Sequence, residues 1–414
     1  MNDPKPIVPA RTLAIFTGLN LLNYVDRYIF PAVATPLKHD LGIDDEQFGR
    51  LATTFMIGYF LTAPFFGYLG DRVPRKWLIA LGVTIWSVGT IFFGFAHGLI
   101  ALFALRIMVG VGEASYGTLS PGWIADLYPS GKRNQALAWF YLAMPVGTAI
   151  AFKLGGWMAT NYDWRLAFMW AGAPGLVLAV AVLFLREPAR GASEAESTRE
   201  SVPDTPGWRV YLRLFGLKTY VLVIAGYVGY TFAMGGFVVW AAQFFERVHG
   251  MDLEAADNFF GLSVIITGIF ATMLGAWIAA AWQRRSPAGN AWLLALSALA
   301  AVPTVFAAFL LDDPAAARVA LAVAMFLLFL STGPVNTVIL EVVPVTMRAS
   351  AMAAAIFAIH FFGDLWSPWI VGVISDRVHD LRSAVLWTLP PAVAVCAFCW
   401  CWLALRMRGV NVRN

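Results

Sequence analysis

Long apolar stretches follow one another along almost the whole chain. Each holds about 20 residues, enough to cross the hydrocarbon core of a bilayer as one α-helix. The pattern predicts an all-α integral membrane protein with twelve transmembrane helices in two six-helix bundles. The stretches lie at 12–37, 48–70, 77–97, 99–126, 136–160 and 166–186, and then at 219–246, 257–281, 289–311, 316–343, 349–376 and 383–407.

The interval between the two groups has a different composition. Residues 187–217 are rich in Pro, Ser, Glu and Arg and hold too few apolar residues to span a membrane. We expect an N-terminal bundle over 1–186, a cytoplasmic linker over 187–217 and a C-terminal bundle over 218–414. Near the end of the linker, a short helix on the membrane interface is predicted from Trp208, Tyr211, Leu212 and Leu214.

Composition supports the membrane assignment and limits the choice of partners. Hydrophobic residues make up 59% of the chain and charged residues only 13%, whereas ordinary soluble domains carry roughly 25% charge. The net charge is +4, and most of the 29 Lys and Arg fall on one side of the membrane if both termini are cytoplasmic. The basic balance therefore reflects orientation in the membrane and predicts no nucleic-acid partner.

A short pattern recurs in the two halves at a spacing of 215 residues. In each half an acid at the end of a span is followed by Pro three positions later and by Arg seven positions later. The recurrence predicts two like-oriented halves related by a pseudo-two-fold axis, with a substrate site between bundles near the bilayer midplane. The residues are Asp126, Pro129 and Arg133 in the first half and Glu341, Pro344 and Arg348 in the second.

Charged residues inside the predicted spans are few and mark the candidate site. Each is costly at the bilayer centre unless it faces a partner or a water-filled cavity. Arg106 and Glu113 are seven residues apart, so they lie on one stripe of the fourth helix. Asn23, Asp26 and Phe30 form a similar stripe on the first helix. We expect the two acids to flank Arg106, which cannot lose its proton.

Such a cluster has two interpretations. In the functional one, Arg106 holds the acids ionised while burial favours their neutral forms. A substrate phosphate or carboxylate bound at Arg106 then weakens that hold and favours proton uptake. In the structural one, the charges are an ion-pair set that fixes the first helix against the fourth. Arg27 points to a different face and fits either interpretation equally.

Further polar and aromatic residues are candidates for lining a substrate cavity. His360 and Asp364 are one helical turn apart and form either a second titratable pair or a packing contact. Aromatic residues at helical spacing, Phe232, Phe237, Trp240 and Phe244, either line an apolar region or pack. Lys153 either faces the cavity or extends to the interface. The full set of candidates is Asn23, Tyr24, Phe30, Tyr116, Lys153, Phe237, Trp240, His360 and Asp364.

Two loops at the predicted cytoplasmic ends of helices have the character of a conformational latch. Glycines there permit a close helix contact and a tight exit, and the acid can pair with a basic group or a helix N-terminus. The alternative is a set of anchors that obey the positive-inside rule. The latch candidates are Gly67, Gly70, Asp71, Arg72, Arg75 and Lys76, together with Asp126, Arg133, Glu341 and Arg348.

These motifs resemble those of a known family. The Gly67 to Lys76 loop and the Arg106-x-x-x-Gly110-x-Gly112 stretch resemble two motifs of the major facilitator superfamily. More narrowly, the chain resembles the Spinster branch at Asn23-Tyr24-Val25-Asp26-Arg27, at Ala63 to Arg72, at Gly112-Glu113-Ala114-Ser115-Tyr116, and at Ile359 to Asp364 with Ser367-Pro368. The match is dense in the first half and thinner over the seventh to tenth helices.

The resemblance implies the major facilitator fold and transport by alternating access. Spinster proteins move lipid-like amphiphiles, lysophospholipids and sphingosine-1-phosphate among them. It also implies that the acid on the first helix and the Arg and acid on the fourth, here Asp26, Arg106 and Glu113, couple substrate to protons. The alternative is a proton-linked exporter of drug-like amphiphiles or of other small organic solutes.

Other classes of protein find less support in the sequence. We find no HExxH, GxSxG or Walker motif, so an enzyme is not expected. Cys396, Cys399 and Cys401 lack a fourth ligand, and neither a metal nor a cofactor is predicted. The repeat and the lack of a large soluble domain disfavour a channel or receptor. Short termini and the absence of Asn-x-Ser/Thr sequons favour a bacterial inner membrane, and we expect a monomer.

Overall fold

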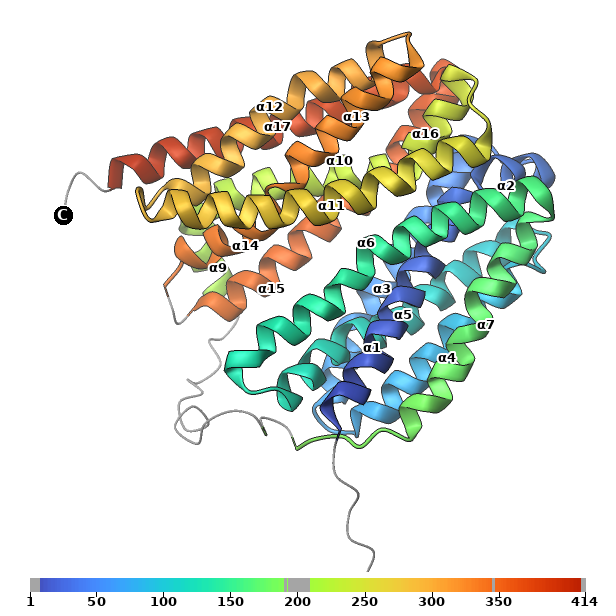
Figure 1. Cartoon of the computed structure of the whole chain (residues 1–414), viewed down its shortest axis with the longest axis horizontal. Helices are drawn as coiled ribbons and strands as arrows, with labels where there is room; N and C mark the ends of the chain where they lie inside the picture. The colour runs from blue at the N-terminus through green and yellow to red at the C-terminus, as the bar shows by residue number, and fades with distance from the viewer. Residues whose placement is uncertain (1–7, 190–191, 193–208, 345–346, 411–414) are drawn as a thin grey trace, which may run out of the picture. The chain divides into compact units, whose positions relative to one another are not determined.

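The computed structural model describes residues 8–189, 192, 209–344 and 347–410, and the regular elements in these ranges are all helices (Figure 1). Most of the predicted linker, including Trp208, lies outside the described residues. The first half contains α1 (Pro9–Ala32), α2 (Ala34–Leu41), α3 (Asp45–Gly70), α4 (Arg75–Phe93), α5 (Leu99–Leu127), α6 (Ser130–Asn161) and α7 (Trp164–Leu183).

The second half begins with a short helix and continues with longer ones. The elements are α9 (Arg209–Gly216), α10 (Lys218–His249), α11 (Leu253–Gln283), α12 (Gly289–Leu310), α13 (Pro314–Phe329), α14 (Thr332–Glu341), α15 (Arg348–Ile359), the π-helix η2 (His360–Asp364), α16 (Ser367–Val378) and α17 (Leu381–Val410). Each of the twelve predicted spans corresponds to one helix or to consecutive helices, and α9 is the short helix expected before the second half.

Three of the predicted spans are broken, and proline or glycine explains each break. The first span divides at Val33, two residues after Pro31. The tenth divides between α13 and α14, where Pro334 lacks the N–H that a continuous helix needs. The eleventh contains η2, which holds Gly363 and ends shortly before Pro368.

Eleven helical segments among the described residues are long and apolar enough to cross a membrane. The exception is α1, whose mean hydropathy is lowered by Asn20, Asn23, Asp26 and Arg27. A bilayer helix that carries this much polarity must turn it toward protein or water. α1, the predicted span that does not belong to this apolar group, is therefore the helix expected to carry functional groups.

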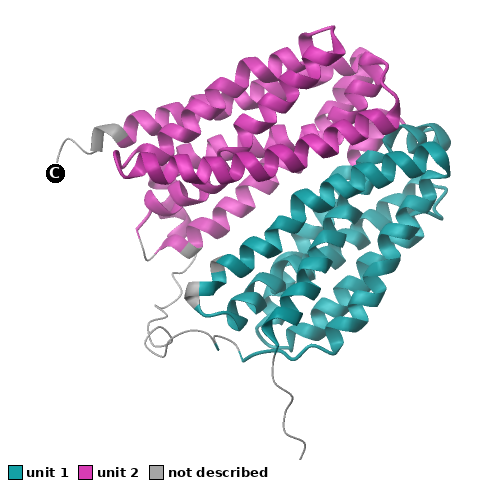
Figure 2. Cartoon of the chain, viewed as in Figure 1, with its two compact units in different colours: residues 1–43, 51–202 teal, residues 44–50, 203–414 magenta. Residues whose placement is uncertain are grey.

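The chain divides into two compact units, shown in Figure 2. Unit 1 contains residues 1–43 and 51–202, and unit 2 contains residues 44–50 and 203–414. The packing pattern is the same within each: α4 packs on α5 and α7, as α12 packs on α13 and α17. This recurrence agrees with two six-helix bundles related by a pseudo-two-fold axis. The beginning of α3, up to Arg50, belongs to unit 2.

Close helix contacts in unit 1 bring the polar stripes together. A Cβ on Gly110 of α5 would lie 2.2 Å from the carbonyl oxygen of Phe55 on α3. On α6, a Cβ on Gly147 would lie 2.6 Å from the carbonyl oxygen of Leu21 on α1. Backbone therefore packs directly on backbone at both crossings.

Tyr116 lies in the packed core of unit 1. Its side chain is 1% exposed, its ring packs edge-on against Trp86, and its hydroxyl donates to the carbonyl oxygen of Phe16, 2.5 Å away. In this structure Tyr116 therefore links α5 to α1. This placement differs from the cavity-lining position expected from the sequence.

Candidate functional site

A buried ion pair between α1 and α5 forms the centre of unit 1. The Nη2 of Arg27 lies 2.8 Å from Oε2 of Glu113, and its Nε lies 3.2 Å from the same oxygen. Glu113 is fully buried, whereas the Arg27 side chain keeps 20% of its surface exposed. Two hydrogen bonds from one guanidinium hold the carboxylate in place. Glu113 therefore enters the apolar interior with its charge compensated.

The identity of this partner corrects the geometry expected from the sequence. Arg106 was expected between the two acids, but its Nε donates to the backbone oxygen of Leu51, 3.2 Å away. Arg27, expected on a different face, reaches Glu113 instead, because its long side chain can extend around α1. Among the described residues, Arg106 forms no ion pair with a carboxylate.

Arg106 is held by aromatic rings and not by an opposite charge. Its guanidinium carbon lies 4.4 Å from the centre of the Phe30 ring and 4.9 Å from that of Phe55. The side chain is 4% exposed. Cation–π contacts compensate part of the cost of burial, and the terminal amino groups donate to no acceptor among the described residues. Arg106 is thus a buried cation with unused donors.

Asp26 has no close cation either. It is 2% exposed, and neither carboxyl oxygen has a hydrogen-bond partner of good geometry among the described residues. Trp86 and Thr90 on α4 are its polar neighbours, and Glu113 is a like charge nearby. A buried carboxyl group in such surroundings is costly when ionised and much less costly when it carries a proton.

The four ionisable groups interact electrostatically as one cluster. Glu113 acts on Asp26, Arg27 and Arg106, and the two arginines repel each other. If both acids were ionised, the cluster would be formally neutral. Because only one close ion pair is formed, a change of charge at one member alters the proton affinity of the others.

Aromatic side chains surround the Arg27 end of the cluster. The guanidinium carbon of Arg27 lies 4.9 Å from the ring centre of Phe55, 5.3 Å from that of Tyr24 and 5.5 Å from that of Tyr59. Asn23 lies beside Glu113, although its amide nitrogen makes no hydrogen bond of good geometry. The expected Asn23, Tyr24 and Phe30 thus all lie at the cluster.

The cavity candidates of the second half have other surroundings. Phe237 stacks on Phe309, and Trp240 donates through Nε1 to the carbonyl oxygen of Pro368 at 3.0 Å. Both are fully buried in unit 2 and act as packing residues in this structure. On α6 of unit 1, Lys153 is exposed.

His360 and Asp364 form a pair at the π-helix. Nδ1 of His360 lies 3.0 Å from one carboxyl oxygen of Asp364 and 3.1 Å from the other. A π-helical turn of this kind is frequent at functional sites. Both side chains are partly exposed.

The predicted latch of unit 1 contains a charge network. Arg75 is ion-paired with Asp126 at 2.7 Å and with Glu187 at 2.8 Å. A Cβ on Gly70 would lie 2.2 Å from a methyl carbon of Leu119, so α3 and α5 meet closely there. Arg72 lies over the Tyr68 ring. Glu187, which sequence reasoning did not select, completes this network.

The equivalent position in unit 2 has different chemistry. Asn290 stands 215 residues after Arg75, as Glu341 stands 215 residues after Asp126. Nδ2 of Asn290 donates to Glu341 at 2.9 Å, and Gln283 also donates to this carboxylate. Arg348 donates to the backbone oxygen of Leu340. The fold repeats, but a neutral amide replaces the arginine.

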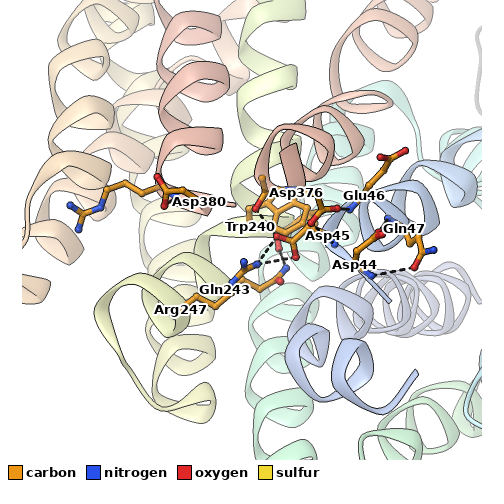
Figure 3. A network of polar contacts seen from close by, with 12 residues as sticks. Asp44, Asp45, Glu46, Gln47, Trp240, Gln243, Arg247, Asp376 and Asp380 are labelled. Atoms are coloured by element: carbon orange, nitrogen blue, oxygen red, sulfur yellow. Dashed lines mark hydrogen bonds and ion pairs between the residues drawn. The ribbon is translucent and has the colours of Figure 1, made fainter. Parts of the chain in front are cut away.

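A second polar network, within unit 2, was not predicted from the sequence (Figure 3). Arg247 Nη1 donates to both carboxyl oxygens of Asp45, at 2.7 and 2.9 Å, and Ser375 Oγ donates to Asp45 at 2.6 Å. Asp376 accepts from the backbone N–H groups of Asp45 and Glu46, which caps the start of α3.

These residues escaped notice because each lies at the end of an apolar stretch, where charge is ordinary. The sequence signal that remains for this network is the presence of glycine on the two helices. A Cβ on Gly372 would lie 2.3 Å from the carbonyl oxygen of Asp45, and a Cβ on Gly49 would lie 2.5 Å from that of Pro368. Glycines near the ends of two spans therefore mark the contact between α3 and α16.

No group of three or more His, Cys, Asp or Glu side chains suited to a metal ion occurs in the part of the chain that the structure describes. The three cysteines are free thiols on α17.

Comparison with known proteins places this arrangement in a family. A model of the Major Facilitator Superfamily matches residues 16–368. Human protein spinster homolog 1 is 33% identical over 392 residues, covering 89% of this chain and 74% of the human protein. Protein spinster of Drosophila melanogaster is 30% identical over 397 residues, covering 91% of this chain. The chain spans 65% of the length of the fly protein.

A solved structure matches the fold over nearly all of the chain. It is a crystal structure of a bacterial homologue of the human lysosomal transporter Spinster, in an inward-facing and unoccupied conformation. The two chains are 25% identical, the TM-score is 0.83, and the match covers 99% of each. Both the sequence and the fold comparisons therefore lead to the same group of transporters.

We predict that Arg27→Met destabilises the protein by about 3 kcal/mol, because Glu113 is then left buried without its partner. Glu113→Gln should cost less, since a neutral amide tolerates burial better than an unpaired carboxylate. The double variant Arg27→Met/Glu113→Gln should recover part of the loss. Thermal unfolding in detergent measures all three variants, and equal destabilisation in the single and double variants would contradict the pairing.

Proposed function

Because the chain belongs to the Spinster family of the Major Facilitator Superfamily, it is a multi-pass membrane transporter, and we propose that it moves an anionic amphiphile in exchange with or together with protons. The substrate class is a lysophospholipid or a sphingosine-1-phosphate-like lipid. The family assignment also favours a transporter over an enzyme. The observation that carries the proposal is the state of Arg106, a buried cation without an acidic partner.

The unused hydrogen-bond donors of Arg106 favour an anionic substrate. A guanidinium presents five N–H groups in a plane that matches phosphate and carboxylate. Only the Nε group of Arg106 has an acceptor among the described residues. The phosphate oxygens of a lipid headgroup would accept hydrogen bonds from the remaining donors. The desolvated charge would then gain a partner, and this gain provides the binding energy.

The amphiphilic nature of the substrate follows from what surrounds the cation. Phe30 and Phe55 lie against the Arg106 guanidinium, and Tyr24 and Tyr59 lie near that of Arg27. A group bound at these cations would lie beside apolar aromatic rings. A lipid with a small charged head and an alkyl chain suits such a mixed site better than a sugar does.

Proton coupling follows from the electrostatic linkage within the cluster. An anion at Arg106 adds negative charge near Glu113, which in turn interacts with Asp26, and this favours a protonated acid in the cluster. By reciprocity, protonation of an acid strengthens binding of the anion. Asp26 is the better proton carrier, because Glu113 is held by Arg27. We propose that His360 and Asp364 line the substrate cavity.

We propose alternating access, with the Arg75–Asp126–Glu187 network as the conformational latch. The latch includes Gly67, Gly70, Asp71, Arg72 and Lys76 on one loop and Arg133, Glu341 and Arg348 elsewhere. The distribution of Lys and Arg favours cytoplasmic termini, and we propose a monomer in a bacterial inner membrane. Export of drug-like amphiphiles through the same site is the second candidate, because rings and a cation suit many anionic amphiphiles.

For Arg106 we expect a loss of substrate binding without a loss of fold. Arg106→Gln removes the charge, and because a hydrogen bond to a charged group contributes about 1.5–3 kcal/mol, the Kd for a lysophospholipid should rise roughly 10- to 100-fold. Arg318→Gln is the matched control, since Arg318 also donates to a backbone carbonyl and lies over a phenylalanine ring. Unchanged affinity in Arg106→Gln would overturn the proposal.

The binding panel should contain lysophospholipids, sphingosine-1-phosphate and anionic drug-like amphiphiles. Selectivity for the lipid anions supports the first candidate. Equal affinity for the drug-like anions supports the exporter.

Proton coupling predicts that an imposed pH gradient accelerates uptake of labelled lysophospholipid into proteoliposomes. A protonophore should abolish the acceleration. In Asp26→Asn the exchangeable proton of the unpaired acid is lost, so we expect a weaker response to the gradient. Wild-type transport that is indifferent to the gradient would remove proton coupling and leave facilitated diffusion.

A further inference from the structure

An isolated carboxyl group lies near the beginning of α11 in unit 2. Asp257 is 1% exposed, and neither of its oxygens has a hydrogen-bond partner among the described residues. The helix begins one turn earlier, where Asp252 caps the backbone N–H of Glu254. On the buried side of α11, Asp257 is followed by Phe260, Gly261 and Val264. None of these three has a side-chain donor.

The helices packed against α11 bring no cation to Asp257. These are α10, α12, α13 and α14. At the end of α10, Arg247 is bound to Asp45. The one basic residue of α13, Arg318, donates to the carbonyl oxygen of Pro314 and lies over the Phe259 ring. α12 has no titratable residue.

The remaining titratable groups on these helices are acidic, neutral or directed elsewhere. Glu246 on α10 acts electrostatically on Asp257 and carries the same sign of charge. His249 interacts with Asp312, Asp313 and Arg382. On α14, Glu341 is held by Gln283 and Asn290. Towards the start of α10 lie Lys218, Tyr220, Tyr227 and Tyr230.

An ionised carboxylate in this position would be buried without compensation. Its desolvation is strongly unfavourable in an apolar interior, and the charge of Glu246 adds repulsion. The neutral acid avoids both costs. It still keeps a donor and an acceptor that a polar ligand can use once water enters.

We infer that Asp257 is a proton-binding site of unit 2, separate from the cluster around Asp26 and Glu113 in unit 1. Its ligand is a proton, and Glu246 modulates it: with Glu246 ionised, Asp257 keeps the proton more firmly. The site resembles paired carboxyl groups elsewhere, in which two acids cannot ionise together at low cost. A transporter that holds a proton in each half has two places at which pH acts on it.

Infrared spectroscopy of the purified full-length chain tests this inference directly, because a protonated carboxyl has a C=O stretching band that a carboxylate lacks. We expect wild type at neutral pH to show such a band, and Asp257→Asn to lose part of it. Glu113→Gln, in which the replaced acid is ion-paired, is the control and should keep this component. A spectrum unchanged by Asp257→Asn would overturn the inference.

Glu246→Gln supplies the second measurement and does not require any change at Asp257. Without the neighbouring charge, the band component should disappear at a lower pH on alkaline titration, by on the order of one pH unit. An unchanged midpoint would contradict the role of Glu246. A component that appears only after Na⁺ is removed would show that Asp257 binds a metal cation instead, and would also overturn the inference. Neither result depends on whether the chain transports a lipid.

Discussion

The cost of burying charge is the constraint on which this structure depends. Unit 1 encloses two acids and two arginines between α1 and α5, yet it forms one close ion pair among them, Arg27 with Glu113. Arg106 instead contacts aromatic rings and donates a hydrogen bond to one backbone oxygen. If these residues served only to hold the helices together, full pairing or apolar residues would do so at a lower cost in free energy. The incomplete pairing makes sense if a ligand completes it during transport.

Close backbone contacts make such a cluster possible. Gly110 lets α5 approach α3, and Gly147 lets α6 approach α1, so that long side chains from different helices reach one another. The two units repeat the same packing but not the same chemistry. Arg75 meets Asp126 in unit 1, whereas Asn290 meets Glu341 in unit 2. Charge is concentrated in the first half, and the second half keeps the His360–Asp364 pair and the isolated carboxyl group of Asp257.

The fold was largely predictable from the sequence, because a bilayer demands continuous apolar segments and leaves few alternatives. The breaks in the spans could be traced to proline and glycine only once their positions were seen. Asp26, Arg106 and Glu113 were identifiable as costly exceptions to an apolar pattern. Their pairing was not, because helical spacing fixes the position of Cα and Cβ but not where a long arginine side chain ends. Arg27 therefore took the role expected of Arg106.

Residues at helix ends were the hardest to foresee. Asp45, Arg247 and Asp376 stand where charges are common, so nothing in the pattern separated them from ordinary flanking residues. Asp257 lies a single turn inside α11, and its isolation depends on the directions of Arg247 and Arg318. Phe237 and Trp240 illustrate a different difficulty, because aromatic spacing that suits a cavity suits packing equally well.

The central claim is that an anion bound at Arg106 and a proton on a neighbouring acid stabilise each other. The most direct test is to add a lysophospholipid to the purified protein in weakly buffered detergent solution and to follow the pH with an indicator dye. We expect proton uptake by wild type and little or none by Arg106→Gln at a concentration that saturates both. Binding to wild type without any proton uptake would contradict it.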